Sequence, residues 1–130
     1  MRLTKKEDYA LLILSVIFKN TNNNKRMKLR EISRSTGIPL AFSRKIVFNL
    51  KKGGLLSSKE GVNGGYLLNK DPRDISMKDI FISLEKNLSL TDCFLGNCKY
   101  STICKSARII NKINEELILK FEEIKLTDIL

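Results

Sequence analysis

The sequence predicts a mainly α-helical fold that contains one small β-hairpin and ends in a long helix. Three observations predict it. Apolar residues recur every three or four positions in several stretches, a glycine separates two short helical patterns, and a Gly- and Asn-rich turn separates two short strand-like runs. With 130 residues, of which 42% are hydrophobic, the chain is long enough for one compact domain and an appended element.

The first predicted helix starts at a capping box. In the segment Thr4–Glu7 the threonine hydroxyl can accept an orphan backbone N–H, while the Glu7 carboxylate reaches back to the first residue. The polar run Asn20–Lys25 follows the helix, since asparagines favour turns. The apolar spacing predicts that the helix runs to about Phe18, with these residues on its inner side: Leu11, Leu14, Ile17 and Phe18.

Two short helical patterns follow and are joined at Gly37. Leu29 and Ile32 mark the first, and Pro39 suits the first turn of the second. Two short helices around a glycine turn have the geometry of a helix-turn-helix, whose second helix enters the major groove of DNA. The second helix is expected to stop at Gly53-Gly54 and to bury Phe42, Ile46 or Val47, and Leu50.

The face of this second helix opposite its core stripe carries Arg44 and Lys45, with Ser43 beside them. An ordinary helical hairpin is the alternative, because the pattern is short. The concentration of positive charge favours DNA, so the sequence predicts these three residues as DNA contacts.

A β-hairpin is predicted directly after the two helices. The runs Leu55–Lys59 and Tyr66–Leu68 read as strands, and the turn Glu60–Gly65 supplies glycines that permit positive φ angles. A hairpin in this place makes a winged helix, whose wing lies beside the DNA backbone or the minor groove. Further candidate DNA contacts are therefore Lys59, Asn63 and Gly64.

The excess of basic over acidic residues lies entirely in the first half of the chain. Residues 1–70 contain 15 Lys and Arg against 4 Asp and Glu, whereas residues 71–130 contain 9 against 10. A local positive field favours a polyanionic partner, of which double-stranded DNA is the most common. A basic face that serves only solubility is the alternative.

The second half is predicted to contain a helix over Ser76–Leu84 and a long amphipathic helix over Ile103–Ile124. No other segment is left to cover the long helix, so a second copy of the chain is expected to pack against it, although packing on its own domain is an alternative. We therefore expect a DNA-binding part over residues 1–84 and a dimerising part over residues 85–130. The apolar stripe of the long helix consists of Ile103, Ala107, Ile110, Ile113, Leu117, Phe121 and Ile124.

All three cysteines lie in one short segment, at Cys93, Cys98 and Cys104, and the chain has no histidine. A structural zinc site, a redox disulfide and inert thiols are each possible, but zinc sites usually have four ligands in closer pairs. An iron–sulfur cluster suits thiolates on a glycine-containing loop. Lys99 and Lys105 are expected to favour the thiolate form.

No segment is convincing as a membrane span or a signal peptide. The apolar run Tyr9–Phe18 is too short to cross a bilayer and is flanked by Glu7 and Asp8. A cytoplasmic protein with no membrane partner is expected, and in that compartment thiols stay reduced and clustered cysteines suggest a metal.

The whole chain, residues 1–130, resembles the Rrf2 family of winged-helix transcription regulators. Four stretches carry the resemblance: MRLTKKEDYALLIL at the start, GLLSSKEGVNGGYLL in the wing, the three-cysteine loop, and TDIL at the end. The resemblance implies a homodimer that crosses through its long C-terminal helix. It also implies that Cys93, Cys98 and Cys104 bind an iron–sulfur cluster near the N-terminus of the partner subunit.

The fourth ligand distinguishes two iron–sulfur types within this family. In the IscR type it is a histidine three residues after the last cysteine, where this chain has Ala107. In the NsrR type an aspartate of the first helix can serve, and Asp8 occupies the matching place, with Glu7 as the alternative. The resemblance is thus to the NsrR type and more distantly to the IscR type, and it favours a [4Fe–4S] over a [2Fe–2S] cluster. A helix-stabilising acid is the other interpretation of Asp8.

The function expected is a transcription regulator, a repressor, that senses nitric oxide, redox state or iron–sulfur status. A winged-helix regulator of the same family without a cluster, controlled by a small ligand, a protein partner or thiol oxidation, is the alternative. An electron carrier has no need of a basic wing, and an enzyme is not expected because no catalytic constellation is present. Relatives commonly carry an arginine near the wing tip, where this chain has Glu60.

Overall fold

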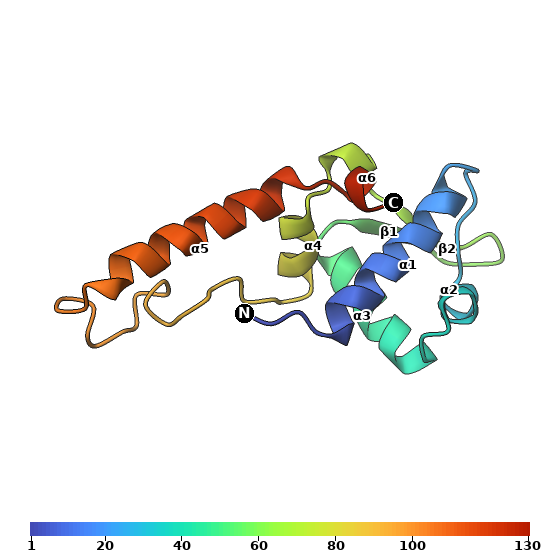
Figure 1. Ribbon diagram of the computed structural model, residues 1–130. Coiled ribbons are helices and arrows are strands. Elements are labelled where there is room, and N and C mark those ends of the chain that lie inside the picture. The colour runs from blue at the N-terminus through green and yellow to red at the C-terminus, as the bar shows by residue number, and fades with distance from the viewer.

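The computed structural model describes all residues from 1 to 130. It confirms a mainly α-helical fold with one two-stranded hairpin. Figure 1 shows a compact body from which one long helix, α5, reaches away. In chain order the elements are α1 (Lys5–Thr21), α2 (Leu29–Thr36), α3 (Leu40–Lys52), β1 (Leu56–Lys59), β2 (Gly65–Leu68), η1 (Pro72–Asp74), α4 (Met77–Ser83), α5 (Ser106–Glu123) and α6 (Leu126–Ile129).

Helix α1 begins at the predicted capping box. The backbone N–H and the hydroxyl of Thr4 both donate to one Glu7 carboxylate oxygen, each at 2.6 Å. The predicted inner face was displaced by about one residue, because α2, α3 and β2 all pack against this helix. Leu11 and Phe18 are only half-buried. The residues in full contact with the core are Ala10, Ile13, Leu14 and Ile17.

Helices α2 and α3 form the predicted helix-turn-helix. Gly37 ends α2 with a φ of 73°, a left-handed conformation that favours glycine, and its N–H donates to the Ser33 carbonyl at 2.9 Å. The Ser33 hydroxyl donates to the Ile38 carbonyl at 2.6 Å, which fixes the chain between the two helices. The buried hydrophobic residues of this unit are Ile32, Ile38, Ile46, Val47 and Leu50.

The expected core position of Phe42 is wrong. Its side chain is 58% exposed and packs edge-on against Tyr9, with ring centroids 6.3 Å apart. Ser43 occupies the inner position instead, with no exposed surface, because its hydroxyl donates to the Ile38 carbonyl at 3.3 Å.

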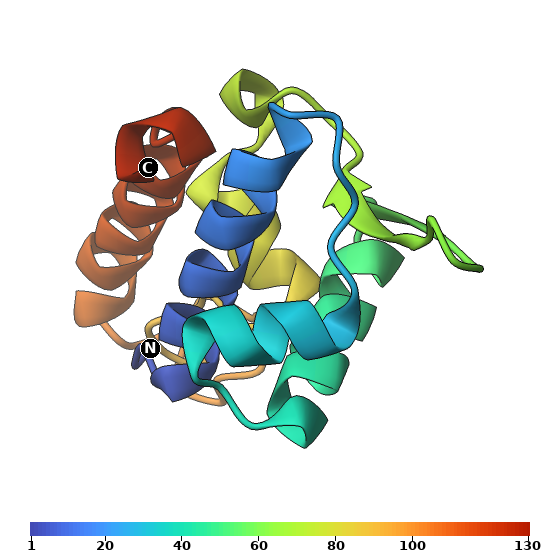
Figure 2. The ribbon, with the colours of Figure 1, turned by 90° about the vertical axis from the view of Figure 1, so that its right-hand side faces the viewer.

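The wing is an antiparallel hairpin in which Leu56 pairs with Leu68 and Lys59 pairs with Gly65. The segment before α2 extends it, since the N–H groups of Met27 and Tyr66 donate to each other's carbonyls at 3.1 and 2.7 Å. A Cβ atom at Gly65 would lie 2.5 Å from the Met27 carbonyl oxygen, so only glycine permits this approach. Figure 2 shows the hairpin projecting from the side of the body away from α5.

The C-terminal end of the chain returns to the body beside α4. The Met77 N–H donates to the Ile124 carbonyl and the Leu126 N–H donates to the Ile75 carbonyl, both at 2.8 Å. Leu126 is fully buried, and Phe81 of α4 meets Phe121 of α5 edge-on with centroids 5.3 Å apart. The last turn of α5 and helix α6 are therefore anchored in the core of the winged helix.

Helix α5 is shorter than predicted, because Ile103–Lys105 belong to the turns that precede it. Only Asn114 along its length is fully buried. Ile109 and Ile113, which are 64% and 51% exposed, leave an uncovered apolar flank on the part of the helix that reaches beyond the body. No helix of the protein is long and apolar enough to cross a membrane.

Asp79 provides a test of how α4 is held. Its carboxylate accepts the N–H of Ser76 at 2.9 Å and the hydroxyl of Ser76 at 2.7 Å. Burial acts to raise the pKa of Asp79, but the two hydrogen bonds from Ser76, with Lys70 and Lys125 nearby, outweigh it and lower that pKa below its ordinary value. The ionised form therefore stabilises the folded protein.

We expect Asp79→Asn to lower the free energy of unfolding by about 1 kcal/mol at pH 7. Because the folded-state pKa is depressed, the contribution is complete above the unfolded pKa of about 4 and is lost as pH falls through the folded value. Urea unfolding at pH 7 and at pH 3 should therefore show a difference from the wild type that narrows in acid. Asp74→Asn, in the exposed turn of η1, is the control, and equal effects of the two substitutions would contradict this role.

Candidate DNA-binding surface and cysteine loop

The outward face of α3 carries unpaired positive charge. Arg44 and Lys45 are exposed, and neither has a carboxylate within 4.0 Å. Ser43, the third residue predicted on this face, lies on the opposite side in the core. The hydroxyl of Ser43 is therefore not free to contact DNA, and it fixes the start of α3 instead.

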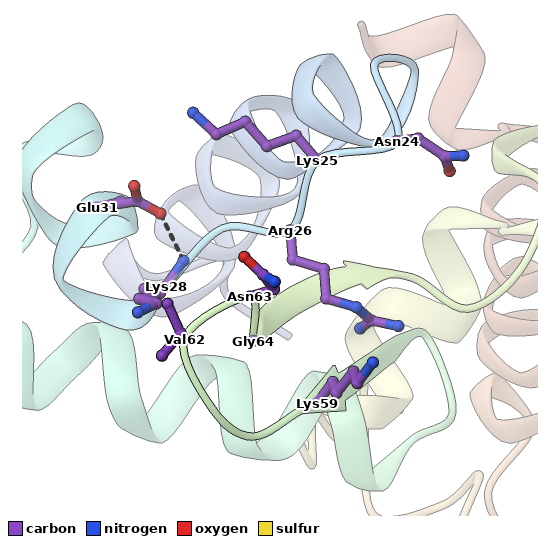
Figure 3. Close-up of a pocket in the computed structure, with 9 residues that line it drawn as sticks. All are labelled: Asn24, Lys25, Arg26, Lys28, Glu31, Lys59, Val62, Asn63 and Gly64. Carbon is purple, nitrogen blue, oxygen red and sulfur yellow. Dashed lines mark hydrogen bonds between the residues drawn. The ribbon is translucent and has the colours of Figure 1, made fainter.

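A basic pocket of about 410 Å³ lies between the wing and the segment before α2. Figure 3 shows the side chains that surround it, with Lys25, Arg26 and Lys28 coming from that segment and Lys59 from β1. None of these four has an ion-pair partner. The one acid in the lining, Glu31, accepts the backbone N–H of Lys28 at 2.7 Å.

Arg26 joins the two sides of this pocket, because its guanidinium donates to the Gly65 carbonyl at 3.4 Å. Sequence reasoning predicted Lys59, Asn63 and Gly64 here but missed Lys25, Arg26 and Lys28. The run KRMK at residues 25–28 was the available signal. The positive field beside the wing therefore comes mainly from a segment that precedes the helix-turn-helix.

Gly64 shapes the turn of the wing. A Cβ atom there would lie 2.3 Å from the Lys59 carbonyl oxygen, and the N–H of Gly64 donates to the Gly61 carbonyl at 3.0 Å. Asn63 beside it is exposed and lines the basic pocket, whereas Glu60 is exposed outside that lining. The turn thus presents Asn63 and Lys59 on the pocket side.

The three thiols are free, half-buried and gathered in the turns that precede α5. The neighbouring Cys98 thiol and burial together raise the pKa of Cys93, with Cys104 adding to the effect. Lys99 was expected to favour the thiolate form of the cysteines. Its ammonium group instead lies over the Tyr100 ring, 4.9 Å from the centroid. Within one chain, no three His, Cys, Asp or Glu side chains are arranged to hold a metal ion.

Buried polar atoms lie on the inner side of this loop. Asn114 accepts the Leu90 N–H at 2.5 Å through its side-chain oxygen, while its amide nitrogen has no partner. The buried hydroxyl of Thr91 lies against the Cys93 thiol, and the side-chain oxygen of Asn111 is buried with no hydrogen-bond partner. Thiols are the ligand type that iron–sulfur clusters use, and the free amide N–H of Asn114 is a donor of the kind that cluster sulfur atoms accept, so the residue types of this loop fit such a cluster although the thiols of one chain are not arranged around a metal position.

The two acids at the start of α1 have different surroundings. Glu7 is 3% exposed and lies 3.6 Å from the Lys86 ammonium. Burial acts to raise the pKa of Glu7, but the Thr4 hydrogen bonds and Lys86 outweigh it and lower that pKa. Asp8 is exposed and has no ion-pair partner. Of the two predicted alternatives, Asp8 is the one whose carboxylate is exposed and unpaired.

The N-terminus also contacts the start of the cysteine loop. The Lys6 ammonium donates to the Leu84 carbonyl at 2.6 Å, and the Lys86 ammonium donates to the Arg2 carbonyl. The first turn of α1 and the segment leading to the thiols are thus held together within one chain.

The structure has a helix-turn-helix, a hairpin wing, and exposed Lys and Arg side chains without ion-pair partners beside both. These features define a winged-helix regulator that binds DNA. The family described as "Rrf2: Iron-dependent Transcriptional regulator" matches residues 3–130. The chain belongs to the Rrf2 family, whose members are transcriptional regulators and not enzymes.

Individual relatives extend over nearly the whole chain. The HTH-type transcriptional regulator NsrR of Bacillus licheniformis is 29% identical over 100% of this chain and 92% of its own length. The regulator IscR of Klebsiella pneumoniae is 30% identical over 90% of this chain and 72% of its own length.

Solved structures agree with the fold. A transcriptional regulator from Listeria innocua superposes with a TM-score of 0.81 at 23% identity, over 98% of this chain and 85% of that one. CymR of B. subtilis, described as the global cysteine regulator, superposes with a TM-score of 0.74 at 21% identity, over 98% and 95%.

Proposed function

We propose that this protein is a repressor whose affinity for its operator depends on an iron–sulfur cluster held by Cys93, Cys98 and Cys104. The observation that carries the proposal is that every thiol of the chain lies in one short loop that leads directly into α5. A loop of this kind couples whatever its thiols bind to the one helix that reaches beyond the body. The expected reduced state of these thiols fits a cytoplasmic protein.

The fourth ligand is Asp8 of a partner subunit, since the chain has no histidine and Glu7 is occupied by Thr4 and Lys86. Cys93, Cys98, Cys104 and Asp8 would hold a [4Fe–4S] rather than a [2Fe–2S] cluster, and the iron bound by Asp8 would be the one at which nitric oxide or oxygen reacts. A carboxylate is a harder and more easily displaced ligand than a thiolate. Asp8 therefore sets how readily the site reacts.

A homodimer provides the second half of the site and of the DNA-binding surface. The exposed flank of α5 around Ile109 and Ile113 packs against its copy. Loss of the tie between Asp8 of one subunit and the cysteine loop of the other changes the spacing of the two α3 helices. That spacing must match half-sites about one DNA turn apart, so operator affinity falls.

On DNA, α3 enters the major groove with Arg44 and Lys45, and the wing lies along the backbone. The basic pocket binds backbone phosphates through Lys25, Arg26, Lys28 and Lys59. Asn63, at the turn of the wing, lines the same pocket and lies close to the same stretch of DNA backbone. These cations supply positive charge beside the wing, where this chain has Glu60 in place of the arginine that relatives commonly carry.

The alternative is a winged-helix regulator without a cluster, in which a small ligand, a protein partner or thiol oxidation controls the same dimer. The fold is similar to that of CymR, described as the global cysteine regulator of B. subtilis, and this similarity supports a regulator without a cluster as the alternative. Selection of duplexes from random DNA, with iron and sulfide determined in protein purified without oxygen, tests the proposal. Selected DNA with a colourless, iron-free protein would support the alternative, and no selected DNA would reject both.

Base and phosphate contacts are separable by substitution. We expect Arg44→Ala to weaken binding to the selected duplex by about 1–3 kcal/mol and to relax its sequence preference. Lys59→Ala should weaken binding to every sequence and lower the slope of log K against log salt by about 1. Arg73→Ala, on η1, is the control and should bind as the wild type does. Unchanged affinity in both variants with the fold intact would reject this surface.

Asp8→Ala tests the fourth ligand. Three thiolates remain, so iron and sulfide should still assemble, but the open iron should lose them faster under nitric oxide. Asp8→Glu, which keeps a carboxylate, should recover part of the stability, and Asp74→Ala should change nothing. Absorption spectra followed over time measure the rate, and a rate for Asp8→Ala equal to that of the wild type would exclude Asp8 as a ligand.

A further inference from the structure

Phe48 is an exposed aromatic side chain in the middle of a basic helix face. It lies on α3 and is 63% exposed, on the opposite face from Ile46, Val47 and Leu50. Its neighbours one helical turn away in either direction are Arg44, Lys45, Lys51 and Lys52, all of them exposed. Among these four cations, only Lys52 has a partner, Glu85 at 4.0 Å.

Phe48 belongs neither to the hydrophobic core nor to the partly buried residues that pack against it. Phe42, the other exposed phenylalanine of α3, packs against Tyr9, whereas Phe48 has no aromatic partner. Figure 2 shows α3 on the side of the body away from α5, so the exposed flank of α5 does not cover Phe48 within one chain. A second copy of this face would bring like charges together, which is unfavourable. The cations around the ring are instead complementary to a polyanion.

The major groove of DNA offers an apolar group to such a ring. Among the base edges exposed there, only thymine carries a methyl group, at C5, and phenylalanine is one of the side chains that contact it. Arg44 and Lys45, one turn earlier on α3, are the proposed base contacts. The four residues from Arg44 to Phe48 advance about 6 Å along α3, so Phe48 reaches base edges within about two base pairs of those contacted by Arg44.

We propose that Phe48 reads the C5-methyl group of a thymine in each operator half-site, and thereby helps to determine sequence specificity. This inference rests on the proposed entry of α3 into the major groove. It assigns a part of the specificity to an apolar contact, which salt does not screen, in contrast to the contacts of Arg44 and Lys45.

The test replaces thymine by deoxyuridine, which removes only the methyl group. Duplexes are first selected from random DNA by the dimeric, full-length protein, and each thymine of the selected half-site is then replaced in turn. Burial of a methyl-sized group contributes about 0.8 kcal/mol, so the wild type should lose about fourfold in affinity at one position. Replacement in both half-sites together should cost roughly fifteenfold.

Phe48→Ala should bind the thymine and deoxyuridine duplexes with equal affinity at that position, while Phe48→Leu should retain most of the preference. Since Phe48 is largely exposed, circular dichroism and the thermal midpoint should be unchanged in both variants. A preference for thymine that persists in Phe48→Ala, or a wild type indifferent to every thymine methyl, would overturn the inference while leaving DNA binding intact. Failure to select any duplex would instead remove the proposed function, and the inference with it.

Discussion

Protein carrying Cys93→Ala, Cys98→Ala or Cys104→Ala is expected to purify without iron or sulfide, and to bind operator DNA with an affinity that nitric oxide no longer changes. Each substitution leaves two thiolates and one carboxylate for a cluster that needs four ligands, so loss of bound iron should be nearly complete. The three thiols are half-buried in turns and lie outside the hydrophobic core. The secondary structure should therefore remain.

Ser101→Ala is the matched control for these variants, because Ser101 lies in the same loop between Cys98 and Cys104 and is exposed. It should retain iron, sulfide and colour. Iron and sulfide determined per chain, after purification without oxygen, give the answer. A cysteine variant that keeps the iron content and the absorption spectrum of the wild type would show that its thiol is not a ligand.

Ile109→Asp combined with Ile113→Asp is expected to give monomers and to abolish tight operator binding. Both side chains are more than half exposed in one chain, so the substitutions should not disturb its fold. Aspartates facing their own copies are desolvated and repel one another. Because two linked recognition helices bind far more tightly than one, operator affinity should fall by about 10²–10⁴-fold.

Sedimentation at micromolar concentration, with the same samples used for DNA binding, measures both effects. Thr127→Asp adds a negative charge at an exposed position of α6 and should leave a dimer. A wild type that sediments as a monomer would contradict the dimer, and a doubly substituted protein that still sediments as a dimer would place the interface elsewhere.

The elements of the winged helix were predictable because each has a local cause. The capping box of Thr4 and Glu7 starts α1, Gly37 with its positive φ separates α2 from α3, and glycines turn the wing. The cysteine motif was equally visible in the sequence, since three thiols in one segment need no knowledge of the fold.

One position on the inner face of α3, that of Phe42, was predicted incorrectly because the helical period fits two choices, whereas the predicted burial of Ile46, Val47 and Leu50 is confirmed. Phe42 lies four residues before Ile46 and Ser43 lies three residues before it, so either spacing fits a helical face. The phenylalanine was predicted as the buried residue because it is apolar. The structure buries Ser43, since its hydroxyl finds the Ile38 carbonyl and so carries no unsatisfied group into the core.

The remaining features depend on contacts between distant segments, which no local pattern contains. The return of Leu126 to the core beside Ile75 requires the whole length of α5 to be known. The basic pocket combines Lys59 with Arg26, which meet only because β2 pairs with the segment before α2. The proposed approach of Asp8 to the thiols would belong to a pair of chains, so no local pattern within one chain contains it.

The central claim is that the state of the cysteine loop controls DNA binding, and the affinity for a selected operator before and after nitric oxide tests it most directly. The measurement uses dimeric protein purified and handled without oxygen, titrated with nitric oxide to the end of the absorption change. We expect a brown protein whose operator affinity falls at least about tenfold after nitric oxide, corresponding to about 1.4 kcal/mol. A colourless protein, or a brown one whose operator affinity is the same before and after nitric oxide, would contradict it.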